Sequence, residues 1–265
     1  MEARPTPDWL RRARAAADAP PALPRVPLLF GADAAPVGSI EPRLGERLAA
    51  AGLPLRQAGA AWWIAEPGDE ALAAIARWLH AERVCSRWRD ELLAVCDATG
   101  RPLGAIERAA VRTLGIATEA VHLDATAVPG GTWVQLRAHG KATDPGQWDT
   151  TMGGQVGHRE SIEETLRRET LEEAGLDLAS LDVLRRRDDV VIRRPVAEGY
   201  MVERIVVFGA SLAADLQPLN HDGEVERFER LDDAALAERL AAGRFTLEAT
   251  LILGARLEQG TCAAR

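Results

Sequence analysis

The sequence is poor in cysteine and has no long apolar run. Its three cysteines, Cys85, Cys96 and Cys262, are scattered without the spacing of metal ligands. An odd number of unpaired cysteines is typical of a reducing compartment, so we expect the chain in the cytoplasm. No stretch near the start resembles the apolar core of a signal peptide, and none reaches the length of a membrane span. We therefore expect no membrane partner.

Excess positive charge is also absent. The 265 residues carry a formal net charge of -8, with a pI near 5.3. Proteins that bind nucleic-acid polymers without sequence preference need a basic surface, so this class is excluded. A small nucleotide bound through a metal ion remains compatible with the charge.

The length allows one large domain or two small ones. We expect a proline-rich start and an α+β domain over residues 1–116, followed by a second domain over residues 117–265. The apolar periodicity of the first part predicts helices and one strand. The helices are expected at 9–19, 69–80 and 101–114, and the strand at 91–97.

The second part has the pattern of hairpins. Apolar runs at 119–127 and 132–137 flank Pro129-Gly130-Gly131, a strong turn signal. We expect a second hairpin from 183–191 and 201–209, a strand at 228–231, and helices at 232–242 and 247–257. Strands with helices on both sides predict an α/β fold of the α/β/α sandwich type, with the smaller α+β domain before it.

The most informative segment is 154–176, GQVGHRESIEETLRRETLEEAGL. Ser161 followed by Glu164 is a capping box that opens a helix, which we expect to end near Ala174. Gly175 then supplies the left-handed residue that a helix end prefers. The segment is therefore predicted to be a loop, a helix and a loop.

Three glutamates, Glu169, Glu172 and Glu173, fall on one face of this helix. Clustered carboxylates repel one another unless a cation neutralises them, and an all-oxygen site suits Mg²⁺ or Mn²⁺. Because Mg²⁺ completes its shell with water and phosphate oxygens, the cluster predicts a phosphate substrate. A solvated acidic helix would also pair Glu with Arg, but it gives no reason for the fixed offsets of Gly154 and Glu160.

This array resembles the Nudix box of the Nudix hydrolases, with Thr170 at a position that is usually aliphatic. The resemblance implies an enzyme that hydrolyses a diphosphate linkage and roles for the box residues. Glu172 and Glu173 would bind the metal most directly, Glu169 would bind it or orient water, and the carbonyl of Gly154 would add a ligand. Catalytic support would come from Arg168, which pairs with a box carboxylate. The structural residues would be Gly153, Glu160 and Gly175.

Nudix enzymes often use a further acid outside the box. Glu224 and Glu226 of the segment 222–226 are candidates for the general base, although acids beside Gly223 are equally typical of a solvated turn. Lys141 and Trp148 precede the box and are candidates for lining a substrate pocket.

More of the chain resembles one branch, the thiamine-pyrophosphokinase-related Nudix proteins with an N-terminal domain of unassigned function. The segments that carry this likeness, in order, are 88–92, 106–110, 115–116, 121–122 and 220–228. The branch implies a small-molecule diphosphate substrate, thiamine diphosphate or its oxidised analogues, and a part in metabolite repair. An ADP-ribose or other nucleoside diphosphate hydrolase and a noncatalytic ligand sensor are the alternatives. A homodimer is compatible with each of these functions.

Overall fold

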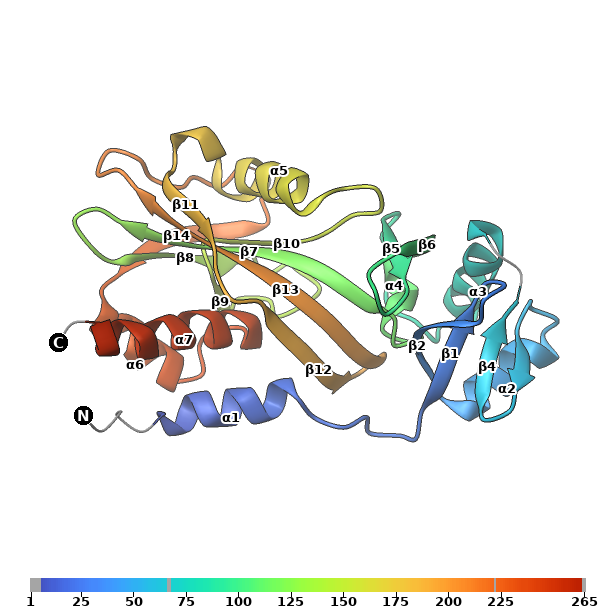
Figure 1. The fold of residues 1–265 in the computed structure, drawn as a ribbon. Helices are drawn as coiled ribbons and strands as arrows, with labels where there is room; N and C mark the ends of the chain where they lie inside the picture. The colour runs from blue at the N-terminus through green and yellow to red at the C-terminus, as the bar shows by residue number, and fades with distance from the viewer. Residues whose placement is uncertain (1–5, 66–67, 222, 264–265) are drawn as a thin grey trace.

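The computed structural model describes residues 6–65, 68–221 and 223–263, with side chains through residue 260. Figure 1 shows a large sheet between helices and a smaller unit beside it. The helices are α1 (Asp8–Ala17), α2 (Pro42–Ala50), α3 (Asp69–Ala81), α4 (Arg108–Val111), α5 (Ile162–Ala174), the 3-10 helix η1 (Leu178–Ser180), α6 (Asp233–Ala241) and α7 (Leu247–Ala263). Among the described residues, no helix combines the length and apolar character that crossing a membrane requires.

The smaller unit, here called the N-terminal unit, comprises residues 26–116. Its strands are β1 (Val26–Phe30), β2 (Ala35–Ile40), β3 (Arg56–Ala58), β4 (Ala61–Ile64), β5 (Leu92–Cys96) and β6 (Pro102–Glu107). The first four form a sheet in the order β2-β1-β4-β3, and β5 and β6 form a separate hairpin. Phe30, Leu72 and Ile106 belong to one buried cluster, so the strands and helices of this unit share a core.

The larger unit contains the remaining strands. These are β7 (Ala117–Ala127), β8 (Thr132–Arg137), β9 (Trp148–Asp149), β10 (Met152–Gln155), β11 (Asp182–Arg186), β12 (Val190–Val196), β13 (Gly199–Leu212) and β14 (Val225–Leu231). Its main order is β11-β13-β7-β8-β14, while β10 pairs with β7, β12 with β13, and β9 with β8. The long parallel pair β7 and β13 is the centre of the sheet.

Helices cover both faces of this sheet (Figure 1). Leu123, Met152 and Leu166 pack together between the sheet and α5. On the opposite face, Ile205 belongs to a cluster with residues of α1 and α7, and Val134 to one with residues of α6 and α7. Alternate residues of each strand thus point to opposite helix layers, as the pleat requires. The predicted α/β/α sandwich is confirmed.

Helix α1 lies on the larger unit, although it precedes the N-terminal unit in the chain (Figure 1). The Arg14 guanidinium contacts Glu258 of α7 at 2.5 Å, and the Ala19 amide donates to the Arg193 carbonyl of β12 at 2.8 Å. The division at residues 116 and 117 remains a prediction. The first helix packs across that division.

The helix predicted at 101–114 is wrong. This segment forms β6 and the single turn of α4. The Asp97 carboxylate accepts hydrogen bonds from the amides of Thr99 and Arg101, and Gly100 has a φ of 83°, so a tight turn folds the chain back onto β5. Pairing with β5 therefore overrides the helical pattern.

The second predicted hairpin is displaced. The hairpin is formed by β12 and β13, with Val196 opposite Gly199, whereas β11 pairs with the far end of β13. Between β11 and β12, the Arg187 guanidinium lies 2.5 Å from the fully buried Asp124 carboxylate, and the Arg187 amide donates to the Val207 carbonyl of β13 at 2.8 Å. The long strand β13 thus pairs with β12 along its first part and with β11 along its last part, which displaces the hairpin. The hairpin predicted around Pro129 is confirmed by the β7 and β8 pairing.

The docking of α1 can be tested with Leu10, which is 0% exposed and lies near Gly254 of α7. Leu10→Ala should lower the free energy of unfolding by about 2–5 kcal/mol, because it leaves a cavity between the helices. Urea titration followed by tryptophan fluorescence measures the loss. Leu23→Ala, at a side chain that is 57% exposed, is the matched control. Equal stability of the two variants would contradict the docking.

Candidate functional site

The helix of the acidic motif, α5, begins and ends where its sequence predicts. The Ser161 hydroxyl accepts from the Glu164 amide at 3.2 Å, and the Glu164 carboxylate accepts from the Ser161 amide at 2.8 Å. This reciprocal capping box satisfies two amides that a helix start leaves free. Gly175 ends the helix with a φ of 63°, and a Cβ there would lie 2.7 Å from the His221 ring. The predicted cap residues are confirmed.

Arg168 is the centre of an ion-pair network on α5. Its guanidinium donates to both oxygens of Glu160 at 2.7 and 2.8 Å, to Glu169 at 2.9 Å and to Glu172 at 3.0 Å. The hydrogen bonds that Arg168 donates to Glu160 raise the pKa of Arg168 and lower the pKa of Glu160 to about 2. Both groups are charged at neutral pH. The network holds the side chains of two box glutamates in fixed positions.

Glu160 also ties the loop before α5 to the helix. Its carboxylate accepts from the Gly157 amide at 3.2 Å and from the Thr165 hydroxyl at 3.0 Å. Loop, helix and Arg168 therefore meet at one side chain. This placement matches the structural role that the resemblance implies for Glu160.

Glu169 packs directly against β10. A Cβ added to Gly154 would lie 2.1 Å from the Glu169 carboxyl carbon, so only glycine leaves room for the carboxylate there. Burial raises the pKa of Glu169 to about 7, Arg168 opposes that rise, and the charges of Glu173 and Glu172 add to it. The neighbouring Gly153 has no room for a side chain either, because a Cβ would meet the His122 ring at 2.6 Å.

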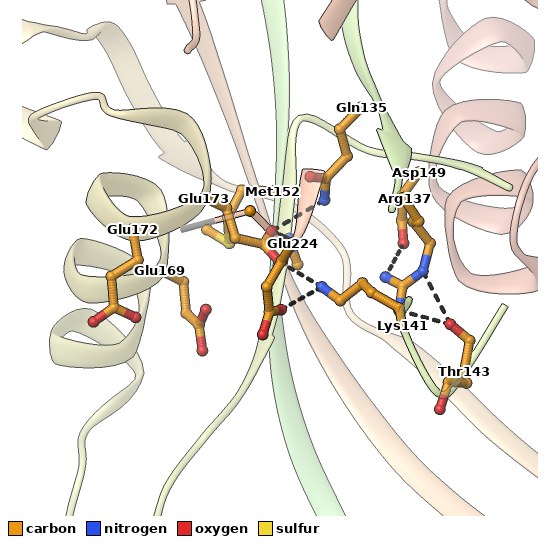
Figure 2. Close-up of polar contacts among 12 residues, drawn as sticks. Gln135, Arg137, Lys141, Thr143, Asp149, Met152, Glu169, Glu172, Glu173 and Glu224 are labelled. Carbon is orange, nitrogen blue, oxygen red and sulfur yellow. Dashed lines mark hydrogen bonds and ion pairs between the residues drawn. The ribbon is translucent and has the colours of Figure 1, made fainter. Parts of the chain in front are cut away.

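Glu173 is the most deeply buried of the box glutamates, with its side chain 2% exposed. Its carboxylate accepts from the Gln135 amide group at 3.0 Å, from the Gly153 backbone amide at 3.2 Å and from the Lys141 ammonium at 2.9 Å. Lys141 also contacts Glu224 at 2.6 Å. Figure 2 shows Lys141 reaching both carboxylates from its loop, with Glu169 and Glu172 further along α5.

The charges of this cluster support one another. Burial works to lower the pKa of Lys141, but the charge of Glu173 and hydrogen bonds to both carboxylates raise it. Partial burial likewise works to raise the pKa of Glu224, but Lys141, with Arg137 and Arg108, lowers it. Glu224 is therefore a carboxylate at neutral pH, the form that accepts a proton.

The two candidate bases differ in position. Both are exposed, but Glu224 forms an ion pair with Lys141 of the Glu173 cluster, whereas Glu226 lies on β14. Among the residues with described placement, the structure gives Glu226 no hydrogen bond or ion pair to a box residue. Asp222, the first acid of that segment, lies outside the described residues.

Arg137 holds the loop that carries Lys141. Its guanidinium donates to the Asp149 carboxylate at 3.0 Å and to the Thr143 carbonyl at 3.0 Å, contacts visible in Figure 2. Asp149 is 3% exposed, so this ion pair is well shielded from water. The loop between β8 and β9 is thereby anchored at its base, and its lysine projects over Glu173.

The oxygen atoms of the box glutamates are of the type that binds a divalent metal ion, although their carboxylates do not converge on one position. Among the described residues, no three acidic, histidine or cysteine side chains form a metal-binding group. Arg168 and Lys141 supply the positive charge instead. The oxygens of Glu169, Glu172, Glu173 and the Gly154 carbonyl are nevertheless hard donors on facing elements, the type that Mg²⁺ and Mn²⁺ prefer.

Sequence reasoning missed Gln135 and gave Lys141 only from its position before the box. One signal was available, because Lys141 is the only lysine among 32 basic residues. All other basic residues that Lys and Arg supply are arginines, so the compact ammonium group of a lysine occurs only at position 141. Trp148, expected near the substrate pocket, is 5% exposed and packs against Phe245 on the opposite face of the sheet.

Comparison with known proteins identifies the family. The NUDIX domain model matches residues 121–250, which include the whole acidic motif. An isopentenyl-diphosphate Delta-isomerase of Leifsonia xyli subsp. xyli is 31% identical over 159 residues, covering 58% of this chain and 83% of that protein. The chain belongs to the Nudix family. The match begins within β7 and ends within α7, so it lies within the larger unit.

A named Nudix hydrolase is also similar in sequence, and a solved structure is similar in fold. Nudix hydrolase 24, chloroplastic, of Arabidopsis thaliana is 30% identical over 178 residues, covering 65% of this chain and 48% of that protein. The crystal structure of DR0079 from Deinococcus radiodurans has a TM-score of 0.52 and 22% identity, covering 63% of this chain and 99% of that one. The chain spans about half the length of the first curated relatives it matches, 46% to 48%.

The contact between Lys141 and Glu173 predicts a stability effect. Lys141→Met leaves a buried carboxylate without its counter-charge, so the free energy of unfolding should fall by roughly 3 kcal/mol. Urea titration in EDTA measures it without any contribution from bound cations. Lys141→Arg keeps the positive charge, so its free energy of unfolding should fall by less. A loss below about 0.5 kcal/mol for Lys141→Met, the size of an ordinary surface change, would mean that Gln135 and Gly153 alone satisfy Glu173.

Proposed function

We propose that this protein is a metal-dependent hydrolase of a small-molecule diphosphate. The observation that carries the proposal is the meeting of Glu169 and Glu173 with the backbone of β10, next to Glu224 from the segment before β14. Within a Nudix domain, this arrangement places hard oxygen donors and an ionised acid at one edge of α5. Such a set suits the attack of water on a phosphorus atom.

Members of this family generally use divalent metal ions. In this chain, Glu169, Glu172, Glu173 and the Gly154 carbonyl would hold Mg²⁺ or Mn²⁺. The bound ion would neutralise phosphate oxygens and lower the pKa of bound water. Arg168 keeps Glu169 and Glu172 in place through its hydrogen bonds, and Lys141 does the same for Glu173.

Glu224 is the preferred general base. Its ion pair with Lys141 keeps it ionised, and a carboxylate accepts the proton as the oxygen of water bonds to phosphorus. The bond from that phosphorus to the bridging oxygen breaks, and the bridging oxygen leaves with the other phosphate. Glu226 remains the alternative base and would have to act from its exposed position on β14.

The proposed substrate is thiamine diphosphate or an oxidised analogue, which would yield the monophosphate and phosphate. Its support is the likeness to the thiamine-pyrophosphokinase-related branch, which extends through segments of the N-terminal unit as well as the Nudix domain. The box itself gives no information on the group attached to the diphosphate. ADP-ribose and other nucleoside diphosphate derivatives are the competing substrates.

A second activity is favoured by one observation. The matched part of this chain covers 83% of an isopentenyl-diphosphate Delta-isomerase at 31% identity. An isomerase returns a product of the same composition and releases no phosphate. The two activities would share recognition of a diphosphate and differ in the bond that changes, so product analysis separates them.

The metal-ligand role of Glu173 makes a direct prediction. Glu173→Gln removes one ligand charge and little volume, so phosphate release should fall by about 100-fold or more while the fold is kept. Glu163→Gln, at an exposed glutamate on the same helix, is the matched control and should keep wild-type turnover. Steady-state phosphate release and circular dichroism measure both. Wild-type turnover in Glu173→Gln would remove Glu173 from the metal site.

Substrate choice is tested with one panel. Thiamine diphosphate, its oxidised analogues, ADP-ribose, nucleoside triphosphates and isopentenyl diphosphate are incubated with the protein in Mg²⁺ and in Mn²⁺. We expect the highest kcat/KM for a thiamine compound. Preference for a nucleotide would replace the thiamine proposal. An isomer without phosphate release would establish the second activity, and no turnover of any compound would favour a ligand sensor.

A further inference from the structure

A pocket lies where the N-terminal unit meets the Nudix domain. It has a volume of about 220 Å³, and four arginines of the N-terminal unit line it: Arg87, Arg89, Arg108 and Arg112. Thr143 and Gln155 belong to its Nudix side. The two parts of the chain thus form one concave surface together, and its basic side comes entirely from the N-terminal unit.

Most of this positive charge is uncompensated. Within the described part of the chain, the guanidinium groups of Arg87, Arg89 and Arg112 have no carboxylate partner, while Arg108 pairs with Glu91 at 2.7 Å. The lining also contains two acids, Glu198 and Glu203. With Arg108 paired to Glu91, the three remaining arginines still outnumber the two acids in the lining, so an anion would meet a small excess of positive charge.

One of those two acids is already engaged. The Glu203 carboxylate accepts from the Thr118 hydroxyl at 3.0 Å and from the Gln155 amide group. Its side chain is also largely buried, with the residue 6% exposed. It is therefore held in the wall of the pocket by neutral donors, and within the described residues it forms no ion pair with the four arginines.

The pocket adjoins the acidic site. Gln155 directly follows Gly154 in β10, and Thr143 lies two residues after Lys141 in the loop that covers Glu173. The His158 amide of the box loop donates to the Leu92 carbonyl of β5 at 2.8 Å, which fixes the N-terminal unit against the box. Arg108 is near enough to help lower the pKa of Glu224. The pocket and the acidic site therefore share two elements, β10 and the loop between β8 and β9.

The size and charge define the ligand. Pockets that enclose a whole drug-sized molecule measure about 300–1,000 Å³, so this one is suited to part of a substrate. Guanidinium groups match the oxygens of a phosphate in geometry as well as in charge.

We propose that this pocket is the subsite for a phosphoryl group of the diphosphate substrate, with the N-terminal unit supplying the arginines. The proposal rests on the proposed function, because the same diphosphate would extend to the carboxylates of α5. It gives the N-terminal unit a direct part in substrate binding.

The test uses the full chain and charge-matched variants. Arg87→Gln combined with Arg89→Gln removes two exposed charges from the pocket, and Arg112→Gln removes a half-buried one. Arg43→Gln combined with Arg77→Gln removes two exposed charges from α2 and α3 of the same unit, away from the pocket. Inorganic diphosphate is titrated calorimetrically in EDTA, so that binding through a metal ion does not contribute. Thermal unfolding confirms that each variant is folded.

We expect the Kd for inorganic diphosphate to rise about tenfold or more in both pocket variants, because each loses charge-assisted hydrogen bonds, and to stay unchanged in the control. With Mg²⁺ and the preferred substrate, KM should rise by a similar factor while kcat changes less than about twofold. If wild-type protein does not bind inorganic diphosphate, or the pocket variants bind it as the control does, the proposal is overturned.

The outcomes for the two proposals are separable. Failure of the hydrolase proposal would appear as absence of turnover in wild-type protein, with arginine-dependent binding of inorganic diphosphate retained. Failure of the pocket proposal would appear as unchanged binding and KM in the arginine variants, with turnover still abolished by Glu173→Gln. The binding titration therefore decides on the pocket whatever the activity assay gives.

Discussion

The arrangement of the acidic site depends on satisfying one buried carboxylate, that of Glu173. Glu173 is almost fully removed from water, and an unpaired charge in that position would be costly. Its partners come from β8, from β10 and from the loop between β8 and β9. These contacts join α5 to the sheet and to the loop that carries Lys141, in addition to the apolar packing of Leu166. The position of Glu224 follows, because the same lysine reaches it.

Local sequence patterns predicted correctly those helices and strands whose ends are set by residues close together in the chain. Ser161, Glu164 and Gly175 predict the two ends of α5, because a capping box and a left-handed glycine each act within one helical turn. The segment 101–114 failed for the opposite reason. Its apolar residues do have helical periodicity. The turn at Asp97 nevertheless brings the segment beside β5, and residues 102–107 pair with residues 92–96 as a strand instead of forming a helix. No periodicity within the segment contains that information.

The candidate site divides in the same way. The acidic face of α5 follows from residue spacing, and so does the need for glycine beside it. The contacts that neutralise the face do not, because Lys141 and Gln135 are 32 and 38 residues from Glu173. The arginine pocket is more distant still, since it forms only when two separately built units meet. In the N-terminal unit, local patterns predicted α3 and β5 but not β1–β4, α2 or β6. They gave no information on the contact with the Nudix domain.

The single lysine gives this protein an unusual chemical handle. Amine-selective reagents do not modify guanidinium groups, so acylation can label only one side chain in the 265 residues. The labelled atom would be the one between Glu173 and Glu224. Its reactivity requires the neutral amine, which both carboxylates disfavour. A metal ion that binds Glu173 or Glu224 in place of Lys141 would change the rate at which the peptide containing Lys141 is labelled. Mass spectrometry of that peptide would therefore detect metal binding without a substrate.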